Sequence, residues 1–336
     1  MSTNSLRRII CGILILLVAT ELHGQKKLGQ TGFQFLSVGT DARATGMGEA
    51  FTTVTGGSGS MLYNPAGMAQ LTGSFDASMS LNNWIAGIQY QSVTAAFRPA
   101  GGRFGVFGVS LTAVDYGEIQ GTVRGNNEQG YVDTEIFTPM ATAVGIGYAR
   151  AMNDRFSVGG HIKTIAQSLG ESIIPVMEQG RPTDENTVNT NVASAVAFDF
   201  GTLYQTHYKG FVFGMSVRNF SEEIRYEQEA FQLPLTFQIG ASINALEFLS
   251  VSLPGQSLLI TAEAVHPRSY PEHVKIGLEY SLGQTLSLRG GYAFEHDEFG
   301  LSFGFGLYAF GIAFDYAVTP FDIFDNVQRI TVRLGY

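Results

Sequence analysis

Three histidines with neighbouring carboxylates are the residues in this sequence that could do chemistry. The candidates are His266, His273 and His296, which lie near Glu272, Glu295, Asp297 and Glu298. Imidazole and carboxylate groups together can bind a divalent metal or supply the base of a hydrolytic site. However, no tight ligand spacing supports a metal site, and histidines in loops are usually just solvated. We therefore expect no catalytic residues, no cofactor and no metal centre.

The N-terminus has the pattern of an exported protein. A basic pair, Arg7–Arg8, is followed by the apolar run Ile9–Val18. This order is that of a secretory signal peptide, with a cleavage site predicted after Gly24, so we assign residues 1–24 to a signal peptide. The single cysteine, Cys11, lies inside it. The mature chain is therefore predicted to have neither disulfides nor a cysteine zinc site.

The composition of the rest of the chain points to a membrane β-barrel. Hydrophobic residues make up 45% of the sequence and charged residues only 15%, whereas about 25% charged residues is usual in soluble proteins. After residue 24 no apolar run approaches the roughly 18–20 residues that a membrane helix needs. Export, few charges and no membrane helix favour an outer-membrane β-barrel over a secreted β-sandwich. The net charge of −9 argues against nucleic acid as a partner.

Residues 73–336 contain fourteen segments of alternating hydrophobicity, each about as long as a tilted strand that crosses a bilayer. They lie near residues 73–82, 84–98, 103–115, 137–150, 155–168, 191–203, 210–218, 234–246, 257–265, 272–281, 285–294, 299–308, 310–318 and 328–336. The expected fold is therefore all-β: a fourteen-stranded antiparallel transmembrane barrel in the bacterial outer membrane.

The connections between these segments support the count. An outer-membrane barrel alternates long external loops with short periplasmic turns. The long connections, residues 116–136, 169–190, 219–233 and 319–327, all follow odd-numbered segments, whereas the others are mostly tight, such as "PAGG" and "MNDR". A sandwich has no reason to place its long loops on one side.

The last predicted strand, "QRITVRLGY", indicates which side chains face the lipid. Its apolar residues from Ile330 to Tyr336 alternate with Thr331 and Arg333. The same parity along the barrel predicts charges of both signs in the lumen. They are Lys163, Arg218, Lys275, Arg289 and Arg333 against Asp199, Glu263, Glu279 and Asp315. A balanced set indicates internal ion pairs, whereas a ring of one sign would indicate ion selectivity.

Residues 25–72 are the best candidate to fill a lumen that side chains alone cannot fill. The segment is rich in glycine and lacks a regular period, yet it has enough apolar side chains to pack. Pro65 and Gly67 fix a turn in it. We predict a hatch or plug over residues 25–72 and the barrel itself over residues 73–336. A disordered periplasmic leader is the alternative.

Two stretches of this segment, "FQFLSVGTDARATGMGEAFTTVTG" and "MLYNPAGMAQL", resemble the N-terminal signature of the PorV/PorQ family. Those outer-membrane proteins are relatives of the FadL-type fatty-acid transporters. The motif residues are Asp41, Arg43, Gly46, Gly48, Tyr63, Asn64, Pro65 and Gly67, while Glu49 stands where the family often has a small residue. The resemblance implies that the segment folds into the barrel and that Asp41 and Arg43 meet the lumenal charges.

The resemblance also implies a non-enzymatic role in type IX secretion, with the translocon and its cargo proteins as partners. The members of the family bind cargo at the cell surface and pass it to an attachment complex. The three longest external loops are each net acidic. Such loops could dock a basic partner or bridge divalent cations to lipopolysaccharide, although a merely solvated acidic loop is common.

The alternative is a FadL-like transporter of hydrophobic small molecules. It would need an apolar pocket against the hatch and a lateral gap in the wall. Residues 84–98 and 103–115 break phase near Gln91 and Val106, which we interpret as β-bulges that would suit such a gap. The charged lumen favours the secretion role over an apolar path.

Overall fold

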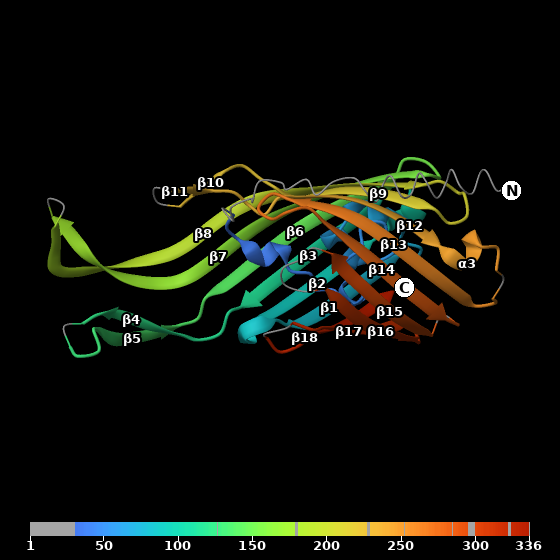
Figure 1. The fold of residues 1–336 in the computed structure, drawn as a ribbon. Helices are drawn as coiled ribbons and strands as arrows, with labels where there is room; N and C mark the ends of the chain where they lie inside the picture. The colour runs from blue at the N-terminus through green and yellow to red at the C-terminus, as the bar shows by residue number, and fades with distance from the viewer. Residues whose placement is uncertain are drawn as a thin grey trace, which may run out of the picture.

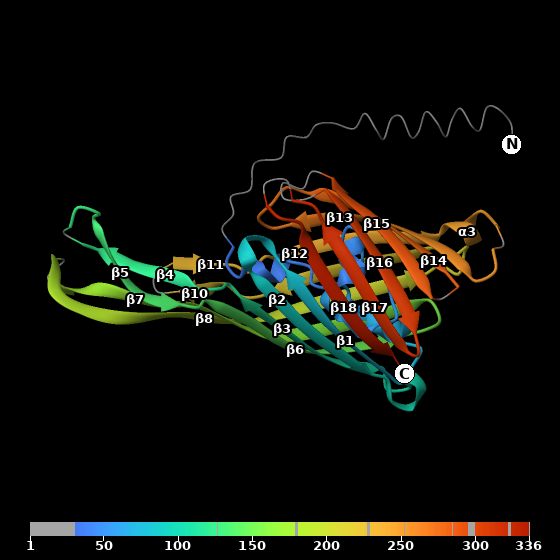
Figure 2. The same ribbon diagram turned by 90° about the horizontal axis from the view of Figure 1, so that it is seen from below.

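Fourteen strands among the described residues close into one antiparallel barrel (Figures 1 and 2). The computed structural model describes residues 31–125, 127–178, 181–226, 229–251, 253–283, 285–294, 300–321 and 324–335. Around the barrel the strands follow in chain order, and β1 pairs with β18 to close it. The predicted fold class and the fourteen strands are confirmed.

The barrel strands fall close to the predicted segments. They are β1 Phe75–Asn83, β2 Gln89–Phe97, β3 Val106–Asp115, β6 Met140–Ala151, β7 Phe156–Glu178, β8 Arg181–Gln205, β9 Val212–Phe220, β12 Thr236–Asn244, β13 Gln256–Pro267, β14 His273–Leu282, β15 Leu286–Phe294, β16 Leu301–Ala309, β17 Ile312–Thr319 and β18 Val327–Gly335. Short turns join them at one end, where η5 (Pro99–Gly102) and α3 (Ala245–Phe248) lie. The part of the chain that the structure describes has no helix with the length and apolar character to cross a membrane.

Apolar side chains cover the outside of the barrel, as the alternation predicts. On β18, Ile330, Val332 and Leu334 are exposed, whereas Arg329 and Thr331 are buried. Because the outward residues would meet water in a soluble protein, this exposed apolar surface requires a lipid environment.

The predicted bulges near Gln91 and Val106 were wrong. The pairing of β1 with β2, of β2 with β3 and of β3 with β6 runs without a register shift. Gln91 keeps the outward parity and lies near the start of its strand. β3 begins only at Val106, after Gly105 in the left-handed region, so the preceding residues belong to a turn. The wall therefore has no bulge-made gap at these strands.

Three of the predicted loops contain hairpins, which project from the same end of the barrel (Figure 2). β4 (Ile119–Arg124) pairs with β5 (Tyr131–Phe137), and β10 (Ile224–Tyr226) pairs with β11 (Glu229–Phe231). β7 and β8 have 23 and 25 residues, about twice what a membrane crossing needs. We call this end the hairpin side and the other end the turn side.

The N-terminal segment (residues 31–72) lies against the inward faces of the strands. Its short helices are η1 (Gln34–Ser37), α2 (Ala42–Gly46), η2 (Ser58–Leu62) and η3 (Pro65–Gln70). α2 packs on β15 to β18, η2 on β1 to β3, and η3 on β6 to β8. Met61 and Met68 are buried against Val106 and Ala149 of the wall. The apolar core therefore lies between this segment and the barrel.

Candidate functional site

The Tyr-Asn-Pro-Ala-Gly turn is held by Asn64, which is fully buried. Its Oδ1 accepts from the Ala66 amide at 3.1 Å, so Asn64 caps η3, with Pro65 in the first turn. Its Nδ2 donates to the carbonyl oxygens of Thr52 at 2.7 Å and of Thr202 on β8 at 3.1 Å. A side chain at Gly201 would overlap Asn64 Oδ1, so the wall has glycine where the turn approaches. One asparagine thus joins the turn to the segment and to the barrel.

Asp41 and the motif glycines position α2. Asp41 caps the helix, since its Oδ1 accepts from the Ala44 amide at 2.9 Å. Burial raises the pKa of Asp41 above its ordinary value, and the bond from Ala44 opposes that rise. Gly46 lies against the backbone of Gly304, while Gly48 has a φ of +64°. Asp41 therefore caps the helix, and its carboxylate also lies within electrostatic range of the lumenal charges Asp315 and Arg289.

Arg43 begins an ion-pair network that runs across three strands. Its Nη2 and Nε lie 2.6 and 2.8 Å from the two carboxylate oxygens of Glu279 on β14. Arg289 on β15 donates to the same Glu279 at 2.6 Å and to Asp315 on β17 at 2.6 Å. Both arginines therefore share the Glu279 carboxylate, and the attraction to it raises the pKa of Arg43. The charges of the network balance, two against two.

One further ion pair joins the N-terminal segment to the wall, and another lies within the wall beside the segment. Lys275 Nζ lies 3.1 Å from Glu49 Oε2. Arg333 Nε lies 2.6 Å from Asp76 Oδ2 on β1, and its Nη2 donates to the Gly56 carbonyl oxygen. The segment supplies the Glu49 carboxylate to the first pair and the Gly56 carbonyl oxygen to the second group.

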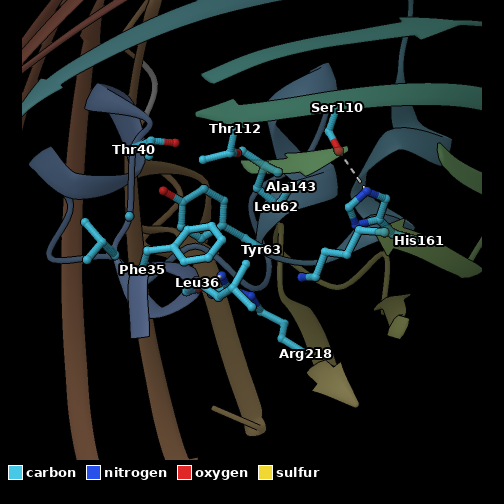
Figure 3. A pocket seen from close by; sticks show the side chains of 13 residues that line it. Phe35, Leu36, Thr40, Leu62, Tyr63, Ser110, Thr112, Ala143, His161 and Arg218 are labelled. Carbon is cyan, nitrogen blue, oxygen red and sulfur yellow. Dashed lines mark hydrogen bonds between the residues drawn. The ribbon is translucent and has the colours of Figure 1, made fainter. Parts of the chain in front are cut away.

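A fourth charged group involves β3, β7 and β8. Lys163 Nζ donates to both oxygens of Asp199, at 2.8 and 2.9 Å. The backbone amide of Asn219 donates to Asp199 Oδ1 at 2.7 Å. His161 Nδ1 lies 2.9 Å from Asp199, and His161 Nε2 lies 2.9 Å from Ser110 Oγ (Figure 3). The order Ser–His–Asp is that of a hydrolase triad. However, Lys163 donates to both oxygens of the Asp199 carboxylate. The adjoining pocket has a volume of ≈ 40 Å³, which is enough for water but not for an acyl substrate.

A larger cavity opens on the hairpin side of the N-terminal segment. Its volume is ≈ 340 Å³, within the range of small-molecule sites. Aromatic side chains line it together with basic ones: Trp84, Tyr90, Tyr116 and Tyr270 with Arg218 and Lys275. A third cavity of ≈ 540 Å³ lies on the turn side, and the network of Arg43 lines it. The N-terminal segment contributes to both linings, with Glu49 in the first and Arg43 in the second.

Arg218 and Tyr63 meet in Figure 3 at the edge of the small pocket. The Arg218 guanidinium carbon lies 5.6 Å from the centre of the Tyr63 ring. Among the described residues, Arg218 Nε and Tyr63 Oη have no hydrogen-bond partner. Burial raises the pKa of the Tyr63 hydroxyl well above its usual range. Glu263 has one oxygen bonded to the Thr52 amide at 2.9 Å.

The candidate metal ligands form no group of three among the described residues. His266 Nδ1 lies 2.8 Å from Glu272 Oε1, in an exposed pair. His273 lines the hairpin-side cavity, and His296 lies outside the described residues. Within the described ranges, no group of three or more histidine, cysteine, aspartate or glutamate side chains is placed to hold a metal ion.

Residues 58–326 match the family model of the type IX secretion system membrane protein PorP/SprF. The chain belongs to this family. The match includes the Tyr-Asn-Pro-Ala-Gly turn and nearly the whole barrel, while α2 precedes it. The family found is PorP/SprF, and the more specific likeness to PorV/PorQ remains a prediction. No curated protein matches this sequence.

Solved structures share the fold of this PorP/SprF protein. The monoaromatic hydrocarbon channel CymD is 13% identical, with a TM-score of 0.58 over 89% of this chain and 98% of that chain. The toluene transporter TodX of Pseudomonas putida is 10% identical, with a TM-score of 0.58 over 89% and 99%. A Pseudomonas aeruginosa FadL homologue is 10% identical, with a TM-score of 0.55 over 88% and 98%.

At such low identity these likenesses show a FadL-like barrel and nothing of its substrate. Together with the exposed apolar surface and the secretion family, the fold places this PorP/SprF protein in the bacterial outer membrane. The protein families found are secretion and transport barrels and not enzymes.

The prediction from sequence missed several residues of the charged interior. Asp76, Glu49, Ser110 and Arg329 were not named as site residues. The alternation of β1 and β18 would have identified Asp76 and Arg329 as inward, because each shares a face with other buried residues. Glu49 has no such signal, since it lies in the irregular N-terminal segment.

Proposed function

We propose that this protein is a non-enzymatic component of type IX secretion that binds cargo or translocon proteins at the cell surface. Membership of the PorP/SprF family supports the secretion role. The observation that carries the surface role is the set of three hairpins, β4–β5, β7–β8 and β10–β11, which project from one end (Figure 2). Long external hairpins give a barrel a surface that a partner protein can contact.

The charge of these hairpins supports a basic partner. On β4–β5 the acidic residues Glu128, Asp133 and Glu135 are exposed, against Arg124. Carboxylates of this kind attract cationic surfaces or divalent ions on neighbouring lipopolysaccharide. We propose both as contacts of the hairpin side, with cargo shuttling or an attachment complex of the PorV/PorQ type as the specific role.

We also propose that residues 1–24 serve as a signal peptide and that residues 25–72 serve as a plug. The signal peptide lies outside the described residues. Support for the plug comes from the buried cap of Asn64 and the ion pair of Arg43 with Glu279. Both tie the segment to the wall, so a molecule could pass the barrel only if the segment moved.

Affinity purification from native outer membranes tests the secretion role. We expect the wild-type protein to co-purify with secreted proteins that share a C-terminal β-domain. A variant in which Gly-Asn-Gly replaces residues 119–136 should lose part of this set, whereas Arg155→Ala, in an exposed turn-side junction, should keep it. Recovery of no secretion protein with the wild type would refute the role.

A second function, uptake of a small hydrophobic molecule, is favoured by one observation. The hairpin-side cavity has aromatic walls and a volume of ≈ 340 Å³, as a small-molecule site requires. Native mass spectrometry of the purified barrel tests it. A bound acyl chain or aromatic compound would support transport, and a barrel that stays unliganded in the presence of oleate and toluene would refute it.

A further inference from the structure

The outer half of β8 is a sheet edge on the hairpin side. β9 pairs with β8 from Gln205 only as far as Phe198. Beyond that point β8 continues and pairs with β7, for example Val192 with Ser168. In the part of the chain that the structure describes, no strand pairs with the other side of residues 192–197. We call these six residues the β8 edge.

The opposite edge of the same hairpin is protected, whereas the β8 edge is not. The pairing of β7 with β8 shifts register between Ser168 and Glu171, where β7 has the extra residue. Phe137 of β5 lies over Gly170. Bulges, proline, charge and a covering side chain are the devices that prevent an edge from pairing with another chain. The β8 edge, "VASAVA", contains no proline, no charge and no register shift.

The side chains of the β8 edge suit an added strand. Val192, Ser194 and Val196 face outward and are exposed, about half of each valine being accessible. Ala193 and Ala195 face the other way and pack on the aromatic cluster around Phe35. One face is therefore anchored to the protein, which fixes the register of the edge, while the other offers uncharged, β-branched contacts.

The surroundings of this edge are acidic. Glu222 and Glu223 follow β9 after Ser221 and are exposed, and Glu171 on β7 is exposed as well. A second copy of this chain would bring the same acidic hairpins and a net charge of −9, so like charges oppose that pairing. A basic strand has the complementary charge.

We propose that the β8 edge binds an extended, basic, strand-forming segment of another protein, which adds to the sheet next to β8. Main-chain hydrogen bonds to the edge supply affinity, and alternate side chains of the added strand contact Val192 and Val196. Basic residues of the segment meet Glu222 and Glu223. The inference rests on the proposed secretion role and identifies the β8 edge as the place where a partner protein binds.

Hydrogen–deuterium exchange of the full-length protein in detergent micelles tests the edge. The probe is a peptide of alternating lysine and valine, with a peptide of alternating glutamate and valine as its counterpart. We expect the lysine peptide to slow exchange at alternate amides of residues 192–197 and to bind at least tenfold more tightly than the glutamate peptide. Protection elsewhere only, or equal binding of both peptides, would overturn the proposal.

Two matched variants make the test specific. Ser194→Lys and Val192→Lys add a charge to the exposed face of the edge, which should lower affinity for the lysine peptide at least tenfold. Leu169→Lys adds the same charge on the protected β7 side, where Leu169 is exposed, and should leave binding unchanged. All three positions are at the surface, so the barrel is expected to fold in each.

The test of the β8 edge can be distinguished from the test of the secretion role. If cargo proteins co-purify with the wild type and equally with Ser194→Lys, the secretion role stands and the β8 edge proposal is wrong. If the lysine peptide binds the edge but no secretion protein co-purifies, the edge is a strand-binding site without the proposed role.

Discussion

Arg43 and Glu279 form a two-point contact that joins the N-terminal segment to the barrel wall. Nη2 and Nε of the arginine lie 2.6 and 2.8 Å from the two oxygens of the carboxylate. This paired geometry is the strong form of the arginine–carboxylate interaction. Because Arg289 donates to the same Glu279, the loss of one arginine leaves the carboxylate with a partner and changes the anchoring of the segment more than the wall.

Arg43→Ala should therefore loosen the N-terminal segment while the barrel stays intact. The removal of two charge-assisted hydrogen bonds from a side chain that is 24% exposed should cost about 1–2 kcal/mol. Limited proteolysis should then cleave residues 31–72 faster, and the heat-modified band in electrophoresis should appear at a lower temperature. Arg155→Ala, at an exposed position, is the control. Unchanged cleavage of the segment would show that the pair does not anchor it.

Strand parity could predict which charges face inward but not which charges meet. Alternation in β14 places Lys275 and Glu279 on the inner face, and the sum of the predicted charges indicates internal pairing. The actual partners, Glu49 and Arg43, come from the irregular N-terminal segment. Its path inside the barrel depends on contacts distant in sequence, which no local period records.

The hairpins are a second feature that the sequence pattern could not predict. Residues 169–190 were predicted as a loop, yet β7 and β8 continue through most of them. A strand in the membrane alternates because one face meets lipid, and this signal ends where the hairpin enters water. Beyond that point β-branched residues such as Val188 remain, but a polar strand and a loop look alike in sequence.

Asp199→Asn should destabilise the barrel more than any single exposed substitution. The change leaves Lys163 buried without its counter-charge and weakens the bonds from His161 and Asn219. The removal of one partner of a buried pair costs about 3–5 kcal/mol. Urea unfolding in detergent measures it. The double variant Lys163→Met with Asp199→Asn should recover part of the loss, and simple additivity would contradict the pairing.

Asp41→Asn should change the pH dependence of stability. Since burial raises the folded pKa of Asp41 above its ordinary 3.8, the folded state binds this proton more tightly than the unfolded state. Its contribution is complete below the ordinary pKa and is lost as pH rises through the folded pKa. The free energy of unfolding of the wild type should therefore fall relative to Asp41→Asn as pH rises from about 4 through the raised folded pKa.

The asparagine keeps the capping acceptor, so the helix start is matched in the two proteins. Urea unfolding at several pH values gives the difference directly. A difference that grows in favour of the wild type with rising pH would mean that the folded pKa of Asp41 is lowered.

Two adjacent glycines on β15 test how closely the N-terminal segment approaches the wall. A Cβ at Gly291 would overlap the backbone of Met47 and Gly48, whereas a Cβ at Gly290 would meet nothing within 4 Å. Gly291→Ala must therefore displace the segment or the strand, at a cost of about 1–3 kcal/mol. Gly290→Ala occupies open space and should be neutral or slightly stabilising, because it reduces the freedom of the unfolded chain.

Limited proteolysis and unfolding together distinguish the two possible responses to Gly291→Ala. If the segment moves, residues 31–72 become sensitive to protease while the barrel unfolds at nearly the same urea concentration. If the strand moves, the barrel itself is destabilised and the segment follows it. If the two alanine variants have the same protease sensitivity and the same urea unfolding, Gly48 does not lie against β15 in solution. The described packing of α2 on the wall would then be wrong.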